Sequence, residues 1–520
     1  MGQVCLVFGI KSTTQAGLEI VAGTAYLWSS RNRKKWCNMS LDLTNSYAEL
    51  PAQFYTRQRP APVPAPELIR LNHDLVKRLG LETDDLTADI MSGNQVPDGA
   101  DPLAMAYAGH QFGGFSPQLG DGRAVLLGEI TAPDGAHFDL QLKGSGRTRY
   151  SRGGDGKAVL GAVLREYIVS EAMFALGIPT TRALAVAKTG EQVMRETPLP
   201  GAVLARIAAS HIRVGTFQYF YAKQDTEALQ SLLDHAIERH YPTAANAEVP
   251  ALAFLHEVMQ KQADLVAHWM SVGFIHGVMN TDNMAISGET IDYGPCAYMD
   301  EYDPAKVFSS IDRQGRYAFA NQPGIAHWNL AQLAQSLLPL IHDEPEKAAE
   351  KAQGVLDAFA QMFTSAYLKR FAAKLGISAP REGDNGLISG FLSLMEENRT
   401  DFTLAFRHLT RAIDAGDFRA LADLFANSNA FTAWKSNWQT RIAHDDTAVI
   451  LKTAQAANPI FIARNHRVEA AIDAANQEDF APFEALIDVL KKPFEAQPSM
   501  VEFEKPPKEN EIVQATFCGT

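Results

Sequence analysis

The apolar pattern of the chain changes from strand-like to helical near residue 220. Before this point, short apolar runs alternate with glycines, and the turn Pro133-Asp134-Gly135 separates Ala124–Ile130 from Phe138–Lys143. Proline, aspartate and glycine each suit a turn position, so we expect the two runs to form an antiparallel hairpin. From about 226 the spacing is mainly helical, notably over 251–272 and 327–341. The chain is therefore expected to be an α+β protein, β-rich first and helical afterwards.

The net charge and the cysteine content limit the kinds of binding partner, and the cellular compartment, that we expect for the chain. Lys plus Arg number 47 and Asp plus Glu number 60, so the net charge of -13 repels nucleic acids and anionic membrane surfaces. No stretch approaches the run of about 18 apolar residues that a membrane-spanning helix needs. The four cysteines, Cys5, Cys37, Cys296 and Cys518, are too scattered for a disulfide framework or a paired zinc site. A cytoplasmic protein without nucleic-acid or membrane partners is expected.

A lysine and a glutamate lie where a strand and a helix would bring them together. Lys143 ends the second strand of the expected hairpin, and Glu166 lies in the helical stretch 157–176, which stops at Gly177. The neighbours of Glu166 at helical spacing are apolar or small, so its carboxylate needs a cation, and Lys143 is the candidate. Protein kinases hold nucleotide phosphates with such a strand lysine and helix glutamate.

A second set of polar residues follows about 110 positions later. His276 precedes Asn283 by seven positions, and Asp292-Tyr293-Gly294 comes after them. This is the spacing of a kinase catalytic loop and its metal-binding tripeptide. Val278 occupies the usual position of the catalytic base, where valine cannot accept a proton, while Asp282 adds a carboxylate beside Asn283.

Each of these signals also has a plainer interpretation. Glycines 120 and 122 are ordinary turn residues if taken alone, Lys143 is a solvated strand end, and Glu166 is a partly exposed helix acid. Asp282, Asn283 and Asp292 would form a cluster of Asx turns, and His276 is interpreted as a hydrogen-bonded core histidine rather than a catalyst. The order of these signals along the chain favours a single nucleotide-binding site to which all of them contribute.

Four stretches resemble the selenoprotein O family of kinase-fold proteins, the YdiU-like protein adenylyltransferases. They are Tyr107–Gly113, Gln118–Arg123, Leu140–Gly146 and His276–Asn283, and the resemblance extends from about Asn45 to the C-terminus. It implies a two-lobed protein-kinase-like fold of the pseudokinase kind, with an additional C-terminal helical region. It also implies transfer of AMP from ATP to Ser, Thr or Tyr hydroxyls of protein substrates.

The resemblance assigns roles to individual positions. Gly120, Gly122, Arg123, Lys143, Asp155, Gly156, Arg206, Arg213 and Asp292 would bind the nucleotide. Lys143 with its partner Glu166 and the proton acceptor Asp282 would be catalytic, and Asn283 and Asp292 would bind Mg²⁺ or Mn²⁺. The arginines would grip the displaced phosphates, a task that suits planar, permanently charged groups.

The expected organisation combines the composition with the resemblance. Prolines at 60, 62, 64 and 66 indicate an extended connector. The expected segments are an extension outside the fold (1–38), a connector with helices (39–104), a β-rich nucleotide-binding lobe (105–220), a helical lobe with the catalytic loop (221–375), a further helical region (376–495) and a tail with Cys518 (496–520). A monomer is favoured.

Two alternative functions stay open at this point, and the chain departs from the family pattern at its C-terminal cysteine. Conventional phosphotransfer and a non-catalytic, ATP-binding regulatory role both fit a chain with Val278 at the base position. The family takes its name from a selenocysteine near the C-terminus, where this chain has Cys518. Some relatives pair the terminal cysteine with one in the segment that corresponds to Val307–Asp312, which has none here. A disulfide between Cys518 and Cys296 is a remaining hypothesis.

Overall fold

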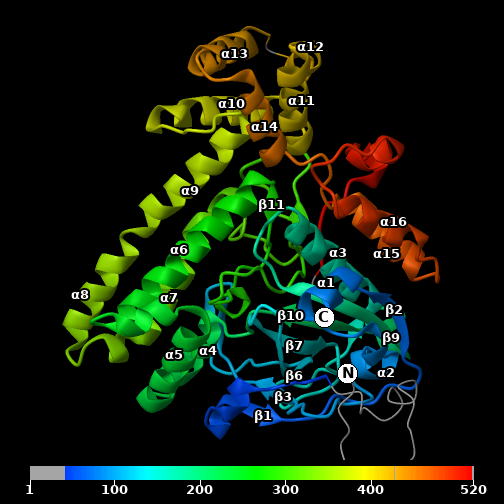
Figure 1. Ribbon diagram of the computed structural model, residues 1–520, viewed down its shortest axis with the longest axis vertical. Coiled ribbons are helices and arrows are strands. Elements are labelled where there is room, and N and C mark those ends of the chain that lie inside the picture. Colours follow the sequence, from blue (N-terminus) through cyan, green and yellow to red (C-terminus); the bar gives the residue numbers. More distant parts are fainter. Residues whose placement is uncertain (1–40, 427, 518–520) are drawn as a thin grey trace, which may run out of the picture. The chain divides into compact units, whose positions relative to one another are not determined.

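A large antiparallel sheet forms the β-rich part of the computed structural model, which describes residues 41–426 and 428–517 (Figure 1). The eight strands lie in the order β1-β3-β6-β7-β10-β9-β2, with β8 beside β10. Their bounds are β1 (Tyr55–Arg57), β2 (Glu67–Leu71), β3 (Leu103–Met105), β6 (Ala124–Thr131), β7 (His137–Lys143), β8 (Ala158–Val159), β9 (Arg182–Met194) and β10 (Pro198–Ala208). The expected hairpin is present as β6 and β7, with Ala124 opposite Lys143.

The segment 39–104 contributes more to this sheet than the expected connector and helices. It supplies β1, β2 and β3 as well as the short helices α1 (His73–Leu79) and α2 (Ala88–Ser92). Strands of three to five residues are too short for an alternating pattern to distinguish them from loops. Residues 1–38, which were expected to be an extension, lie outside the described residues.

Both faces of the sheet are covered. Along β6, Val125 and Leu127 point to the face that α1 and α2 cover, whereas Leu126 belongs to the core on the opposite face. On that second face lies α3 (Leu160–Ala175), which carries Glu166. The helix begins three residues later than expected because Ala158 and Val159 pair with β10 as strand β8.

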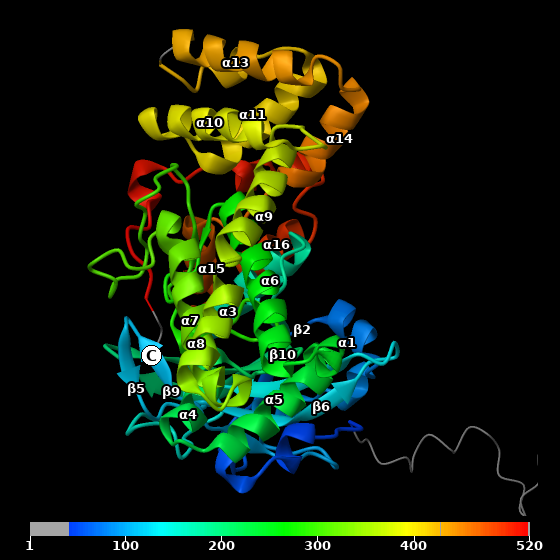
Figure 2. The same ribbon diagram turned by 90° about the vertical axis from the view of Figure 1, so that its left-hand side faces the viewer.

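Long helices follow the sheet, as expected. Their bounds are α4 (Val214–Ala222), α5 (Thr226–His240), α6 (Pro250–Ser271), α7 (Gln322–Ile341), α8 (Pro345–Leu356) and α9 (Phe359–Lys374). Helix α6 packs against α7 and α9, and α8 packs against α7 (Figure 2). Between α6 and α7 the chain forms a small hairpin, β11 (Phe274–Ile275) with β12 (Ala297–Tyr298), and the polar stretch 276–294 connects its strands. None of the helices in the described part of the chain is long and apolar enough to cross a membrane.

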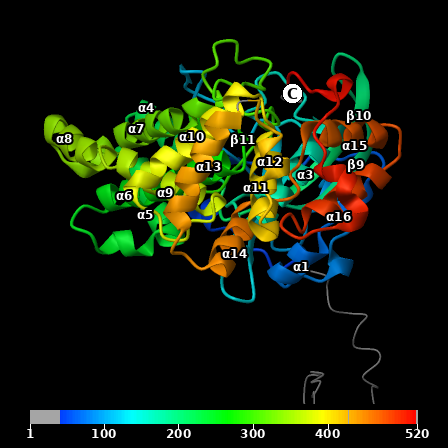
Figure 3. The same cartoon turned by 90° about the horizontal axis from the view of Figure 1, so that it is seen from above.

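Helices α10 to α16 follow, and the last two of them return to the sheet. The bounds are α10 (Asn385–Glu397), α11 (Phe402–Ala415), α12 (Arg419–Ala422), α13 (Ser428–Ile442), α14 (Thr447–Ala457), α15 (Asn465–Ala475) and α16 (Ala481–Leu490). Helices α15 and α16 pack against α3 (Figure 3). Arg165 of α3 forms an ion pair with Glu469 of α15. Helices α15 and α16 therefore support the helix that positions Glu166.

Lys374, a buried lysine at the end of α9, is expected to lower the stability of the folded chain at neutral pH. Lys374 is 2% exposed, its Nζ atom lies 4.2 Å from the centroid of the Phe406 ring, and no carboxylate of the described residues pairs with it. Burial lowers the pKa of Lys374 to about 7. The unfolded chain, with a lysine pKa of about 10.4, binds more protons between these values, so stability rises with pH from about 7 to 10.

We expect Lys374→Met to raise the free energy of unfolding at pH 7 by on the order of 1–3 kcal/mol, because methionine fills the site without a charge to desolvate. The increase in the free energy of unfolding relative to wild type should be smaller at pH 9. Thermal unfolding at both pH values measures it, and Lys369→Met is the control because Lys369 is an exposed lysine of the same helix. A variant less stable than wild type at both pH values would contradict the expectation.

Candidate functional site

One cavity of about 620 Å³ brings together all the residues to which the resemblance assigns a nucleotide-binding, catalytic or metal-binding role. Its lining includes Gly120, Gly122, Arg123, Lys143, Asp155, Gly156, Glu166, Arg206, Arg213, Asp282, Asn283 and Asp292. These residues come from the strands β7 and β10, from helix α3 and from the loops that follow β5 (Gly114–Ser116), β7, β10 and β11. Positions that are up to 172 residues apart in the chain therefore share one chemical environment.

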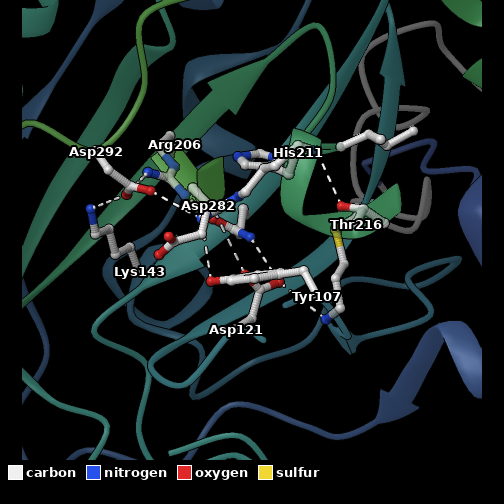
Figure 4. Close-up of polar contacts among 12 residues, drawn as sticks. Tyr107, Asp121, Lys143, Arg206, His211, Thr216, Asp282 and Asp292 are labelled. Atoms are coloured by element: carbon white, nitrogen blue, oxygen red, sulfur yellow. Dashed lines mark hydrogen bonds and ion pairs between the residues drawn. The ribbon is translucent and has the colours of Figure 1, made fainter. Parts of the chain in front are cut away.

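Lys143 stands between two carboxylates. Its Nζ atom lies 2.6 Å from Glu166 Oε2 and 2.6 Å from Asp292 Oδ1, so the expected strand-to-helix ion pair is present. Figure 4 shows the Asp292 carboxylate facing both Lys143 and Arg206. Burial opposes the charge on Glu166, but Lys143 and Arg206 outweigh it and lower the pKa of Glu166. The glutamate is thus ionised and fixes the position of the lysine.

Asp292 has three cations around it. Besides Lys143, Arg206 Nη1 lies 2.8 Å from Oδ1, and Arg213 Nη1 lies 3.1 Å from Oδ2. Burial alone would raise the pKa of Asp292, but the three cations hold that pKa well below its usual range. The backbone of Asp292 has a φ of 63°, which is rare for a non-glycine residue. The local chain thus adopts a costly conformation that aims this carboxylate at the cations.

The two arginines are buried and held by several acceptors. Arg206 is 1% exposed and donates to Gln141 Oε1 at 2.6 Å and to Glu166 Oε1 at 3.1 Å. Buried guanidinium groups in this state are preorganised, because their hydrogen bonds leave few orientations open.

Arg213 is held in the same way from the other side of the cavity. Its Nη1 atom donates to the Tyr107 hydroxyl at 3.2 Å and to the Asp282 carbonyl oxygen at 2.9 Å. The guanidinium lies over the Tyr107 ring, 4.5 Å from the centroid, and Asp121 Oδ1 is 3.8 Å from Nη2. Arg213 therefore connects the loop that carries Asp282 with the cation cluster around Asp292.

Asp282 combines burial with an oxygen left without a hydrogen bond. The side chain of Gln111 donates to Asp282 Oδ2 at 3.1 Å, whereas Oδ1 has no hydrogen-bond partner among the described residues. Burial raises the pKa of Asp282 to about 6, against the opposing effects of Gln111 and Arg213. A buried carboxylate oxygen without a partner, in the wall of a cavity, is suited to accept a proton from a bound group.

The remaining residues of the set line the cavity in different ways. Asn283 donates from Nδ2 to the carbonyl oxygen of Val278 at 3.0 Å, and Asp155 pairs with Arg195 at 2.8 Å. Gly120 has a φ of 87°, and a Cβ atom there would lie 2.9 Å from the carbonyl oxygen of Met105. Glycine is thus required at this turn. This requirement is compatible both with an ordinary turn residue and with a residue that binds the nucleotide.

His276 is a structural residue, as interpreted from the sequence. It is fully buried, its Nε2 atom lies 2.9 Å from the carbonyl oxygen of Ile291, and its ring stacks on Trp269. Burial lowers the pKa of His276. A neutral histidine that holds Ile291 fixes the backbone directly before Asp292.

Several residues that shape the site were not singled out. They are Tyr107, Gln111, Asp121 and Gln141, all in contact with Arg206, Arg213 or Asp282. All four lie in the stretches that carry the family resemblance, 107–113, 118–123 and 140–146. The family resemblance therefore identified the stretches that contain these residues, but their roles depend on contacts between segments that are distant in the sequence.

Gly109 leaves room for the Asp282 carboxylate. A Cβ atom on Gly109 would lie 2.8 Å from Asp282 Oδ1 and 3.0 Å from Asp282 Cβ. We expect Gly109→Ala to push Asp282 aside and lower turnover about 10-fold or more, since small misplacements of a reacting group are costly. Gly114→Ala is the matched control, because its Cβ would only reach the carbonyl oxygen of Gln111 at 3.5 Å. Equal steady-state rates for the two variants would contradict the steric argument.

The C-terminal tail returns to the vicinity of the site. Thr516 pairs with Ser309, and its hydroxyl donates to the carbonyl oxygen of Pro295 at 2.6 Å. Phe517 is 69% exposed. Cys296 is buried, and Cys518 lies outside the described residues, so the disulfide between them stays a prediction.

Comparison with known proteins agrees with the chemistry of the cavity. The family profile described as "Protein adenylyltransferase SelO" matches residues 38–491. A protein nucleotidyltransferase YdiU of Rhodopseudomonas palustris (strain HaA2) is 56% identical over 484 residues, 92% of this chain and 98% of the relative. Its namesake in Bradyrhizobium diazoefficiens is 57% identical over 486 residues, with the same two coverages, 92% and 98%. The one in Rhizobium leguminosarum bv. trifolii is 54% identical over 499 residues, 95% of this chain and 100% of the relative.

Proposed function

Because the chain belongs to the SelO family of protein adenylyltransferases, we propose that it transfers AMP from ATP to Ser, Thr or Tyr hydroxyls of proteins. The acceptor oxygen attacks the α-phosphorus of ATP, and the bond from that phosphorus to the pyrophosphate oxygen breaks. The hydroxyl proton passes to Asp282, and pyrophosphate leaves. We also propose that the sheet and helices α4 to α9 are the two lobes of a kinase-like fold.

One observation carries this proposal: two buried arginines and a half-buried lysine converge on a cavity whose wall also holds a carboxylate oxygen without a hydrogen bond among the described residues. Lys143, Arg206 and Arg213 supply positive charge for the phosphates that leave as pyrophosphate. Asp282 Oδ1 is the acceptor for the proton. The two kinds of group are connected, because Arg213 contacts both Asp292 and the Asp282 backbone.

The residues of the cavity fit a divalent cation. Asp292 offers a carboxylate and Asn283 a carboxamide oxygen, and Mg²⁺ or Mn²⁺ prefers such oxygen ligands together with substrate phosphates. A bound ion would neutralise charge that develops on the phosphate oxygens. Across the described residues no group of three or more His, Cys, Asp or Glu side chains forms a metal cage, so the phosphates of ATP would have to complete the coordination.

The glycine turn and the loop before β8 would hold the rest of the nucleotide. Gly120, Gly122 and Arg123 lie on one side of the cavity, and Asp155 and Gly156 line it from the loop after β7. The absence of side chains at the glycines lets the backbone approach a ligand closely. This arrangement supports a nucleotide between the sheet and the stretch 276–294.

Val278 argues against conventional phosphotransfer. It lines the cavity at the position where a kinase has its base, and its side chain cannot take a proton. The position of the label in ATP distinguishes the two reactions. We expect protein to become labelled from ATP that carries the label on the α-phosphate and not from ATP labelled on the γ-phosphate. Labelling from the γ-position alone would replace AMP transfer with phosphotransfer, and ATP binding without either label would indicate a regulatory protein.

A further inference from the structure

A small hairpin connects the nucleotide cavity with a second cavity beside it. The hairpin consists of β4 (Gly109–Gln111) and β5 (Gly114–Ser116) and pairs with no other strand in the described part of the chain. Its backbone is tied to the loop before Asn283: His110 N donates to Thr281 Oγ1 at 2.7 Å, and Phe112 N donates to Asn280 Oδ1 at 3.1 Å. The hairpin is therefore fixed to the stretch that carries Asp282.

The second cavity has a volume of about 480 Å³ and shares Phe112 with the first. Its other lining residues come from the segment before and at the start of α7, among them Gln314, Arg316, Asn321 and Ile325. Phe112 is 37% exposed and has a φ of 51°, a conformation that costs energy for a bulky side chain. Its backbone N–H group donates to Asn280 Oδ1 and to the Tyr317 hydroxyl, and these hydrogen bonds hold the residue there.

Arg316 is a cation that lacks an anionic partner. Its guanidinium lies over the Trp328 ring, 4.8 Å from the centroid. The Cζ atom would be 3.7 Å from a Cβ atom at Gly113, so the group reaches the tip of the hairpin. No carboxylate of residues 41–426 and 428–517 forms an ion pair with Arg316, whereas Arg206 and Arg213 both have such partners. A positively charged group in a cavity wall is suited to bind a carboxylate from outside.

We propose that the second cavity binds the acceptor protein next to its reacting hydroxyl, and that Arg316 pairs there with an Asp or Glu side chain of the acceptor. This inference rests on the proposed AMP transfer and names its substrate class: hydroxyls flanked by acidic residues. Phe112 forms the wall between the two cavities, so an acceptor segment that crosses it presents its hydroxyl to the nucleotide cavity and its acidic neighbour to Arg316. The exposed rings of Phe112 and Phe115 supply apolar contact.

The experiment compares acceptor peptides that differ only in charge. Each peptide has one central Tyr, Ser or Thr, with either Glu or Lys at the flanking positions, and AMP incorporation from α-labelled ATP gives kcat/KM. For wild type we expect values on the order of 10-fold higher for the Glu peptides, because attraction is replaced by repulsion in the Lys peptides. Arg316→Glu should reverse this preference without changing the KM for ATP, and Arg316→Lys should retain it.

Arg313→Glu is the matched control, since Arg313 is an exposed arginine of the same segment that does not line the cavity. It should keep the wild-type preference. Equal rates of wild type with Glu and Lys peptides would overturn the inference while leaving AMP transfer intact. The same preference in Arg316→Glu as in wild type would also overturn it. Failure to label any peptide or protein would instead overturn the proposed function.

Discussion

Replacing Asp292 with asparagine is expected to lower the rate of AMP transfer on the order of 1000-fold. Asparagine has the same size but no charge, so it removes the carboxylate of the proposed metal ligand and the anion that faces three cations. Lys143, Arg206 and Arg213 would then repel one another with less negative charge to compensate them, from Glu166, Asp121 and Asp282. Initial rates of incorporation from α-labelled ATP, at saturating Mg²⁺ and then Mn²⁺, measure the loss.

Asp300→Asn is a control of matched chemistry for this variant. The side chain of Asp300 is 20% exposed, close to the 19% of Asp292, and it also pairs with a buried arginine, Arg464, at 2.6 Å. Asp300 does not line the cavity. Its variant should keep the transfer rate within a few-fold of wild type even if its melting temperature falls. Full activity in Asp292→Asn would contradict the proposed role of this residue as a metal ligand.

The second large effect is expected for Asp282→Asn. The asparagine keeps the size of the side chain but has no carboxylate oxygen to accept the hydroxyl proton, so turnover should fall about 100-fold or more. The KM for ATP should change little, because a base acts on the acceptor and not on the nucleotide. Steady-state kinetics with ATP varied at a fixed acceptor concentration separate the two parameters. A variant with full turnover would show that another group takes the proton.

Local signals in the sequence predicted much of the framework. The turn Pro133-Asp134-Gly135 predicted the hairpin of β6 and β7, because three residues with turn preferences separate two apolar runs. Gly177, with a φ of 77°, marked the end of α3. The pair of Lys143 and Glu166 followed from a carboxylate on an apolar helix face that required a cation.

Other features depend on contacts that no local pattern encodes. Strands β1 and β3 contain three residues each and are strands only because they pair with the larger sheet. Arg206 and Arg213 were singled out by the family resemblance alone, since an arginine in an apolar strand or before a helix has no distinctive spacing. Gln111 acts on Asp282 across 171 residues of sequence, and only the fold brings them together.

Intact-mass spectrometry tests the central claim most directly. The purified chain is incubated with ATP, with Mg²⁺ and Mn²⁺ in separate reactions, together with an unfolded acceptor protein rich in Ser, Thr and Tyr. The account predicts that the mass of the acceptor, or of the enzyme itself, rises by one or more AMP groups, and that Asp292→Asn shows no such increase. A rise by single phosphate groups, or no change in any mass while ATP remains bound, would contradict it.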